Sequence, residues 1–177
     1  MGFYPAPMIL TPLLNRWRLA ALVVSAAMLA TAHAFQTFGG YQPCTLCLRQ
    51  REVYWVVGTI ALAFMFLVRL PGGARFRQLT CWILGLGFLV SFAVATYHAG
   101  AEWKFWPGPS TCSSAGSAGV SAQAMQDLLN GAKIKPPACD QVVWSLFGLS
   151  MAGWNALISL GLVGLSALAA LNERSKP

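Results

Sequence analysis

Charged residues are scarce in this chain, and their scarcity limits what kind of protein it can be. Only 10% of the 177 residues are Asp, Glu, Lys or Arg, whereas 56% are hydrophobic. A soluble globule of this length needs more charge to cover its surface. The composition therefore excludes a soluble domain and predicts an integral membrane protein.

Acidic residues are the rarest charged class, with five Asp and Glu against twelve Lys and Arg and a net charge of +7. A basic surface for nucleic acid would gather on one soluble face. Here the basic residues are spread along the chain between long apolar runs. We therefore expect no nucleic-acid partner, and we interpret the basic residues as markers of membrane topology.

Charges are absent from four long stretches, which predicts four membrane-spanning helices. These stretches are 19–48, 53–68, 78–101 and 141–172. A span needs about 20 mostly apolar residues, so the second helix has to reach back to residue 48 with Arg51 and Glu52 at the interface. The chain is then a single membrane domain, 1–177, with spans at about 17–36, 48–69, 79–99 and 144–171.

The distribution of Lys and Arg predicts how these spans are oriented. The two termini and the loop after the second span carry seven basic residues and one acidic residue, a net charge of +6. The other connections and their flanks carry five basic and four acidic residues, a net charge of +1. Lys and Arg mark the cytoplasmic side. We therefore expect both termini in the cytoplasm and external loops at about 37–47 and 100–143.

The second external loop is long enough to hold some structure of its own. Ser121 can cap a short helix that runs to Asn130, and Met125, Leu128 and Leu129 would share one face of it. Such an amphipathic helix lies on a membrane surface. The expected fold class is all-α: a four-helix transmembrane bundle with a short interfacial helix in this loop.

Histidine is nearly absent, with two in the chain, which restricts what the pair Cys44-Thr45-Leu46-Cys47 can do. A c-type haem attachment needs His directly after the second cysteine, where Leu48 stands. Half of a zinc site is an alternative for a C-x-x-C pair. We favour a redox dithiol, because a helix that begins at the pair would stabilise one thiolate through its unpaired N–H groups and its dipole.

Four of the five cysteines fall on the external side: Cys44, Cys47, Cys112 and Cys139. An oxidising compartment favours disulfides over metal sites. We therefore expect these four to make two pairs, with no metal site. Cys81 lies at the cytoplasmic start of the third span, and we assign it no role because a lone buried thiol behaves as a small hydrophobe.

The arrangement Pro-Cys-x-x-Cys-x-x-x-Arg at 43–51, with a second cysteine pair in the next external loop and four spans, closely resembles the DsbB family. Further similarities are Trp-Pro-Gly-Pro-Ser-Thr-Cys at 106–112, His98 fourteen residues before Cys112, and Phe-Gly-Leu-Ser-Met at 147–151. The resemblance covers nearly the whole chain. It implies a multi-pass protein of the bacterial inner membrane, with periplasmic cysteine loops, that reoxidises a DsbA-like periplasmic thioredoxin-fold oxidase and reduces ubiquinone or menaquinone.

The resemblance also implies a role for each cysteine. Cys112 would take the attack of the reduced partner, and the freed Cys139 would attack Cys44, which releases Cys47 as a thiolate facing the quinone. Each step is a thiol–disulfide exchange. The residues implied to bind the quinone are Arg51, His98 and Met151.

Two alternatives stay open from the sequence. One is a paralogue within the family that serves a dedicated partner. The other is a membrane scaffold whose external cysteines are static disulfides or a zinc site. The spans contain few charges, which speaks against a transporter with an ion pathway.

Overall fold

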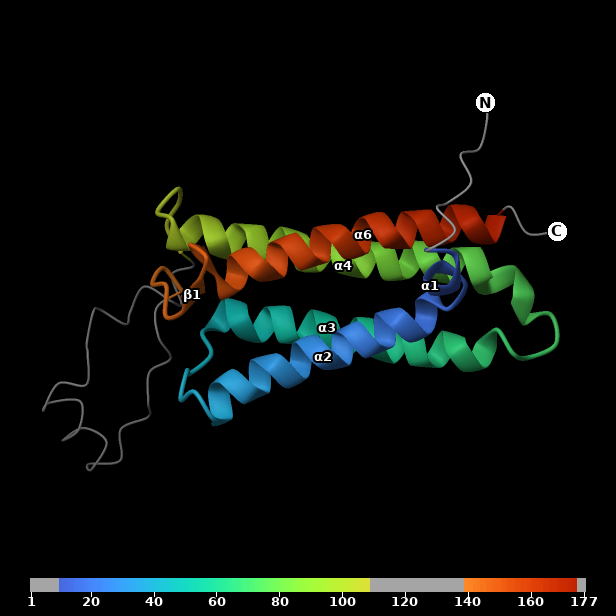
Figure 1. The fold of residues 1–177 in the computed structure, drawn as a ribbon, viewed down its shortest axis with the longest axis horizontal. Helices are drawn as coiled ribbons and strands as arrows, with labels where there is room; N and C mark the ends of the chain where they lie inside the picture. The colour runs from blue at the N-terminus through green and yellow to red at the C-terminus, as the bar shows by residue number, and fades with distance from the viewer. Residues whose placement is uncertain (1–9, 109–138, 175–177) are drawn as a thin grey trace, which may run out of the picture.

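The computed structural model describes residues 10–108 and 139–174, and these residues form a helical bundle (Figure 1). The α-helices are α1 (Thr11–Asn15), α2 (Trp17–Thr37), α3 (Thr45–Leu67), α4 (Phe76–Glu102) and α6 (Met151–Arg174). A 3₁₀ turn, η1 (Gly73–Arg75), precedes α4, and two short strands, β1 (Ser145–Leu146) and β2 (Leu149–Ser150), precede α6. The second cysteine of the long loop, Cys139, is described, whereas Cys112 and the predicted interfacial helix at 121–130 lie outside the described residues.

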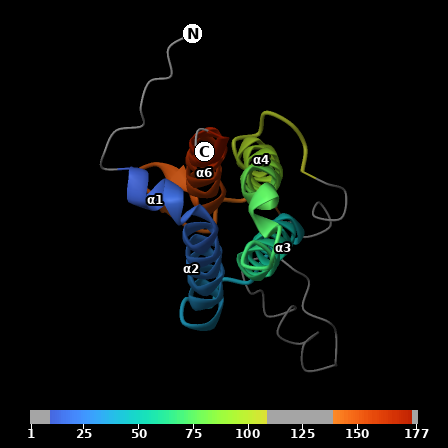
Figure 2. The same cartoon turned by 90° about the vertical axis from the view of Figure 1, so that its right-hand side faces the viewer.

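The long helices pack side by side in a fixed order of neighbours. α4 runs along α6 over its length, α2 runs along α3, and α3 contacts α4. The view along the bundle in Figure 2 shows these helices nearly end-on. Small residues allow the close approach, since a Cβ on Gly85 of α4 would lie 3.0 Å from Ser166 Cβ of α6. Such contacts are typical of helices packed within membranes.

Three of the helical segments in the described part of the chain are long and apolar enough to cross a membrane: α2, residues 73–102, and α6. They fit a multi-pass membrane protein. α3 falls outside this group because Arg49, Arg51 and Glu52 occupy its first two turns. Its apolar part lies between Val53 and Leu67 and packs in the same bundle.

The fourth long helix begins later than the sequence predicts, at Met151 instead of about residue 144. Ser145 and Ser150 pair across an antiparallel hairpin whose turn residues, Phe147 and Gly148, have φ of 51° and 79°. Two successive positive φ values are what a tight two-residue hairpin turn requires. The charge-free run from 141 to 172 hid this turn, because the absence of charge does not distinguish a hairpin from a helix.

Large side chains fill the middle of the bundle. Trp17, Leu84, Phe88 and Val57 are at most 2% exposed. Phe88 contacts the rings of Trp17 and Tyr54, each with a centroid separation of 6.4 Å. This packing fixes α3 against α4, and therefore fixes the polar residues that lie one or two turns further along the same helices.

Candidate active site

The C-x-x-C pair sits where α3 begins. Cys44 is the N-cap residue, with an extended backbone, and its sulfur accepts a hydrogen bond from the backbone N–H of Cys47 at 3.3 Å. The Cys44 thiol donates to the Cys47 sulfur at 3.1 Å, and both cysteines are free thiols. The spacing therefore folds the pair into one helical turn, with the two sulfurs close enough to be joined by a modest side-chain rotation.

The two thiols are electrostatically different. Cys47 lies in the first turn of α3, ahead of the expected span at 48–69, and its hydrogen bond from Cys44 lowers its pKa to about 7 against the opposing effect of burial. Arg51 also lowers this pKa, by a smaller effect. The hydrogen bond to Cys47, followed by burial, raises the pKa of Cys44. Cys47 is thus the thiolate of the pair, and Cys44 holds the proton.

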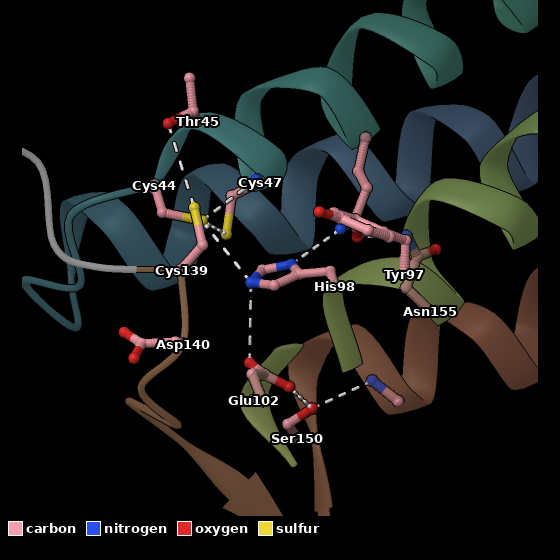
Figure 3. Close-up of polar contacts among 12 residues, drawn as sticks. Cys44, Thr45, Cys47, Tyr97, His98, Glu102, Cys139, Asp140, Ser150 and Asn155 are labelled. Carbon is pink, nitrogen blue, oxygen red and sulfur yellow. Dashed lines mark hydrogen bonds and ion pairs between the residues drawn. The ribbon is translucent and has the colours of Figure 1, made fainter. Parts of the chain in front are cut away.

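His98 of α4 faces the pair from the other side (Figure 3). Its Nε2 lies 3.6 Å from Cys44 Sγ and 3.8 Å from Glu102 Oε1. Its Nδ1 lies 2.9 Å from the side-chain amide of Gln50. The His98 and Glu102 side chains are each 5% exposed. Ser150, the residue before α6, donates to the Glu102 carboxylate and accepts the backbone N–H of Gly153 at 3.1 Å.

A chain of buried side-chain hydrogen bonds continues from His98 into the bundle. Asn155 Nδ2 donates to Gln50 Oε1 at 2.6 Å, and the Tyr54 hydroxyl donates to Asn155 Oδ1 at 2.6 Å. Ser159 lies 3.1 Å from the Tyr54 hydroxyl and 3.0 Å from Ser91. Because the Gln50 oxygen is taken by Asn155, the Gln50 amide nitrogen points at His98 Nδ1, which leaves the proton of the neutral ring on Nε2.

Cys139 reaches the same place from the other external loop. It is disulfide-bonded, 1% exposed, and packs in one cluster with Cys44, Leu46 and Cys47. Its sulfur lies 4.0 Å from Thr45 Oγ1. The structure therefore brings Cys139 against the C-x-x-C pair, although the two are separated by more than 90 residues in sequence.

An ion pair anchors the residue that follows Cys139. Lys104 Nζ donates to the Asp140 carboxylate at 2.6 Å and to its backbone carbonyl at 2.7 Å. The bond from Lys104 lowers the pKa of Asp140, so the carboxylate stays ionised well below neutral pH. Lys104 itself has φ of 63°, a conformation that few non-glycine residues adopt. These contacts tie the end of α4 to the start of the Cys139 segment.

A cavity of about 320 Å³ opens beside Cys47, bounded by α2, α3, α4 and α6. Apolar side chains make most of its wall, and its polar lining includes Gln50, Arg51, Tyr54, His98 and Asn155 with Thr31, Tyr41 and Gln42. Met151 lines it too. The three residues that the family resemblance implies to bind a quinone, Arg51, His98 and Met151, therefore all line one cavity beside Cys47.

Arg51, near the N-terminal end of α3, is held in place by two hydrogen bonds to α2. Its guanidinium donates to Gln36 Oε1 at 2.6 Å and to the Ala32 carbonyl at 2.9 Å. A guanidinium has five N–H donors, so these two bonds leave donors for another acceptor. The bonds hold the cation at the cavity wall.

Sequence reasoning missed several residues of this site. Gln50, Tyr54 and Asn155 form the hydrogen-bond chain, and Glu102 and Lys104 flank His98 and Cys139. A signal was present: Gln50 and Tyr54 are four residues apart, as are Asn155 and Ser159, so each pair lies on one helical face. Polar side chains repeated on one face of an apolar helix mark a buried functional face.

Comparisons with known proteins agree with this geometry. Residues 15–169 match the family model for disulfide bond formation protein DsbB. A disulfide bond formation protein B of Azoarcus sp. is 30% identical over 157 residues, covering 85% of this chain and 87% of the relative. The proteins of the same name from Methylococcus capsulatus and Dechloromonas aromatica are 29% and 30% identical and cover 85% and 80% of this chain, and 90% and 82% of their own length. No solved structure shows a significant match.

Proposed function

This chain belongs to the DsbB family of membrane disulfide bond formation proteins, and from this we propose that it is a thiol:quinone oxidoreductase. It reoxidises a DsbA-like periplasmic thioredoxin-fold oxidase by disulfide exchange and passes the electrons to ubiquinone or menaquinone. One observation supports this above the others: Cys139, Cys44 and Cys47 lie in one cluster that ends at the cavity.

The proposed exchange begins at the disulfide between Cys112 and Cys139. A thiolate of the reduced partner attacks Cys112, which forms a mixed disulfide and releases Cys139 as a thiolate. Cys139 attacks Cys44 of the oxidised C-x-x-C pair and releases the Cys47 thiolate. Its packing against Cys44 supports this choice of target. Each attack exchanges one disulfide for another, so no electron leaves the protein until the last step.

The partner's second thiol completes the cycle. It attacks the mixed disulfide and leaves as the oxidised protein, and the freed Cys112 thiolate attacks Cys139 to restore the loop disulfide and release Cys44. The C-x-x-C pair then holds two electrons as a dithiol. A quinone, when bound, supplies an acceptor for these two electrons and two protons, and the C-x-x-C disulfide re-forms.

The cavity fits such an acceptor. Its volume of about 320 Å³ is at the lower end of the roughly 300 to 1,000 Å³ typical of small-molecule sites, which suits a single ring. Arg51 offers charged donors to an oxygen of the ring, and His98 Nε2 can exchange a proton near Cys44. Met151 would pack on the ring. Cys47, the more acidic thiol, supplies the thiolate next to this space.

We further propose that α3 is the fourth span and that the cysteine loops face the periplasm across the inner membrane. The net charges of +6 and +1 on the two sides support this orientation. Arg51 and Glu52 would then lie at the outer interface, and the C-x-x-C pair would lie at the depth where both a periplasmic protein and a lipid-soluble quinone can reach it.

The test is turnover with defined components. The purified chain in detergent is mixed with a quinone and a reduced DsbA-like thioredoxin-fold protein, and loss of partner thiols is followed together with quinone absorbance. We expect thiol loss that requires the quinone, is abolished by Cys47→Ser, and persists in Cys81→Ala as the matched control. A scaffold with static disulfides gives no quinone-dependent thiol loss, and that result would refute the proposal.

A further inference from the structure

Three potential metal-ligand atoms converge at the C-x-x-C pair. The sulfurs of Cys44 and Cys47 and a ring nitrogen of His98 all lie within 4.8 Å of one another. The two sulfurs are 3.1 Å apart, and Cys44 Sγ is 3.6 Å from His98 Nε2. Cys44 and His98 are each 4% exposed. This is a set of two thiols from the start of α3 and one imidazole from α4, in which Cys44 and His98 are buried and Cys47 is partly exposed.

The spacing suits a tetrahedral site for a thiophilic cation. With Zn–S bonds of about 2.3 Å and Zn–N bonds of about 2.0 Å, tetrahedral geometry sets the sulfurs about 3.8 Å apart and each sulfur about 3.5 Å from the nitrogen. The separation of 3.6 Å between Cys44 Sγ and His98 Nε2 already matches, and Cys47 Sγ lies within 4.8 Å of a His98 ring nitrogen. The sulfurs, now 3.1 Å apart, need to separate by about 0.7 Å, which a χ1 rotation at the start of α3 provides.

The charges around the three ligands also favour a divalent cation. Binding displaces protons from the thiols, and two thiolates neutralise a divalent ion, so the ion adds no net charge to a buried place. Glu102 Oε1, 3.8 Å from His98 Nε2, places a carboxyl group beside the imidazole ligand. Arg51 opposes binding, but its guanidinium is held toward α2 by Gln36 and Ala32.

Gln50 can support His98 as a ligand. A metal on Nε2 requires the ring proton on Nδ1, which then needs an acceptor. Gln50 meets that need by turning its amide so that its oxygen faces Nδ1. Asn155 can turn in the same way, because the Tyr54 hydroxyl beyond it both donates and accepts. The hydrogen-bond chain therefore accommodates either tautomer of His98.

We propose that the reduced C-x-x-C pair and His98 bind one thiophilic divalent cation such as Zn²⁺, and that oxidation of the pair to a disulfide destroys the site. This differs from a structural zinc site, because it exists in one redox state alone. Binding is independent of the proposed function. The consequence that a bound cation blocks turnover, by occupying both thiolates, rests on the proposed function.

Cadmium is a suitable probe because its bonds to thiolates absorb in the ultraviolet. The chain carrying Cys112→Ser and Cys139→Ser keeps the C-x-x-C pair as its external cysteines, and it is titrated with Cd²⁺ after reduction and after oxidation with diamide, without quinone or partner. We expect one Cd²⁺ per reduced chain and loss of the absorbance on oxidation. Cys47→Ser should abolish binding, His98→Ala should weaken it at least about tenfold, and Cys81→Ser should leave it unchanged.

Equal binding by the oxidised chain, or by His98→Ala, would overturn the proposal, as would no binding by the reduced chain. ¹¹³Cd NMR on the chain with His98 intact gives an independent answer, because its shift distinguishes two sulfurs with a nitrogen from two sulfurs with oxygen ligands. A shift without nitrogen ligation would also overturn the proposal. Since no turnover is measured, failure here leaves the quinone assay unaffected, and the reverse holds too.

Discussion

Cys44→Ala is expected to raise the pKa of Cys47 more than Arg51→Gln does. The hydrogen bond from Cys44 is the largest influence that lowers the pKa of Cys47 to about 7, whereas the charge of Arg51 is a smaller one. Burial acts in the opposite direction and remains in both variants. The sequence alone attributes the effect to the helix start and Arg51, so the two variants separate these causes.

The size of the effect follows from the thiolate fraction. At pH 7 a thiol with a pKa of about 7 is roughly half ionised, whereas at the ordinary value of 9.0 it is about 1% ionised, a difference of about 50-fold. A more acidic thiolate is also a weaker nucleophile, and a Brønsted slope of about 0.45 reduces the advantage to about sixfold. The midpoint of a pH profile is therefore more diagnostic than a rate at one pH.

The assay measures alkylation of Cys47 against pH in a chain carrying Cys81→Ser, Cys112→Ser and Cys139→Ser. With Cys44 present and reduced, the midpoint is expected near pH 7. Cys44→Ala should move this midpoint to about pH 9 or above, because burial, which raises the pKa of Cys47, is then no longer offset by the hydrogen bond from Cys44. Arg51→Gln should move it by a smaller amount and should weaken quinone reduction at the same time.

Cys44→Ser is the matched control, because a serine hydroxyl can still donate to the Cys47 thiolate. Its midpoint should fall between those of the parent and Cys44→Ala. If Cys44→Ala leaves the midpoint near 7, the hydrogen bond is not what stabilises the thiolate. If Arg51→Gln changes neither the midpoint nor quinone reduction, Arg51 is an interfacial anchor and its assignment to the site is withdrawn.

Three further predictions concern the path to the pair. Single Cys→Ala changes at the four external cysteines should abolish turnover, and Cys81→Ala should leave turnover normal. Loss of turnover in Cys81→Ala at normal protein abundance would contradict the topology. The four are Cys44, Cys47, Cys112 and Cys139. Cys139→Ala should trap the oxidised partner on Cys112, because the free Cys112 thiolate attacks the partner's disulfide and no Cys139 is left to resolve the adduct. Mass spectrometry would locate the adduct, and capture on the C-x-x-C pair would overturn the order of attack. Lys104→Ala removes the ion pair that holds the segment after Cys139, so it should slow the appearance of the Cys47 thiolate when the chain is mixed with reduced partner in a stopped-flow instrument. The free energy of unfolding should fall by less than about 1 kcal/mol. Arg49→Ala, which removes another exposed ion pair, is the control, and equal rates in the two variants would exclude a role for Lys104.

The long helices were predictable because a membrane-spanning helix requires a long run of apolar residues, which is easily seen in the sequence. Long apolar runs placed α2 and α4 within a few residues of their observed bounds. The same rule failed at 144–150, where positive φ at Phe147 and Gly148 reverses the chain. It did place α3, predicted at 48–69 and observed at Thr45–Leu67, although the early charges keep this helix out of the group that is apolar enough to cross a membrane.

The site was predictable in its cysteines and less so in its supporting residues. The C-x-x-C spacing alone predicts two sulfurs in one helical turn, as observed. By contrast, the contact of Gln50 with His98 joins residues 48 apart, and that of Gln50 with Asn155 joins residues 105 apart. Such pairings depend on which helix faces which, and hydrophobic pattern does not specify that choice.

The buried hydrogen-bond chain is hard to explain by stability alone. Within lipid, apolar side chains could fill the positions of Gln50, Asn155 and Tyr54 without any need for partners, and a hydrogen bond between membrane helices contributes only about 0.6 kcal/mol on average. A single break in the chain, by contrast, leaves a buried group unsatisfied at a cost of about 1 to 3 kcal/mol. The hydrogen bonds of this chain therefore add less stability than a single break in it would remove, and stability does not explain why the chain is there. Its position does, because the chain ends at the ring of His98, which lies opposite Cys44. The direction of its hydrogen bonds is coupled to the nitrogen of His98 that carries the proton, and the amides of Gln50 and Asn155 can turn to match either tautomer, so residues deep in the bundle follow the proton that faces the redox pair.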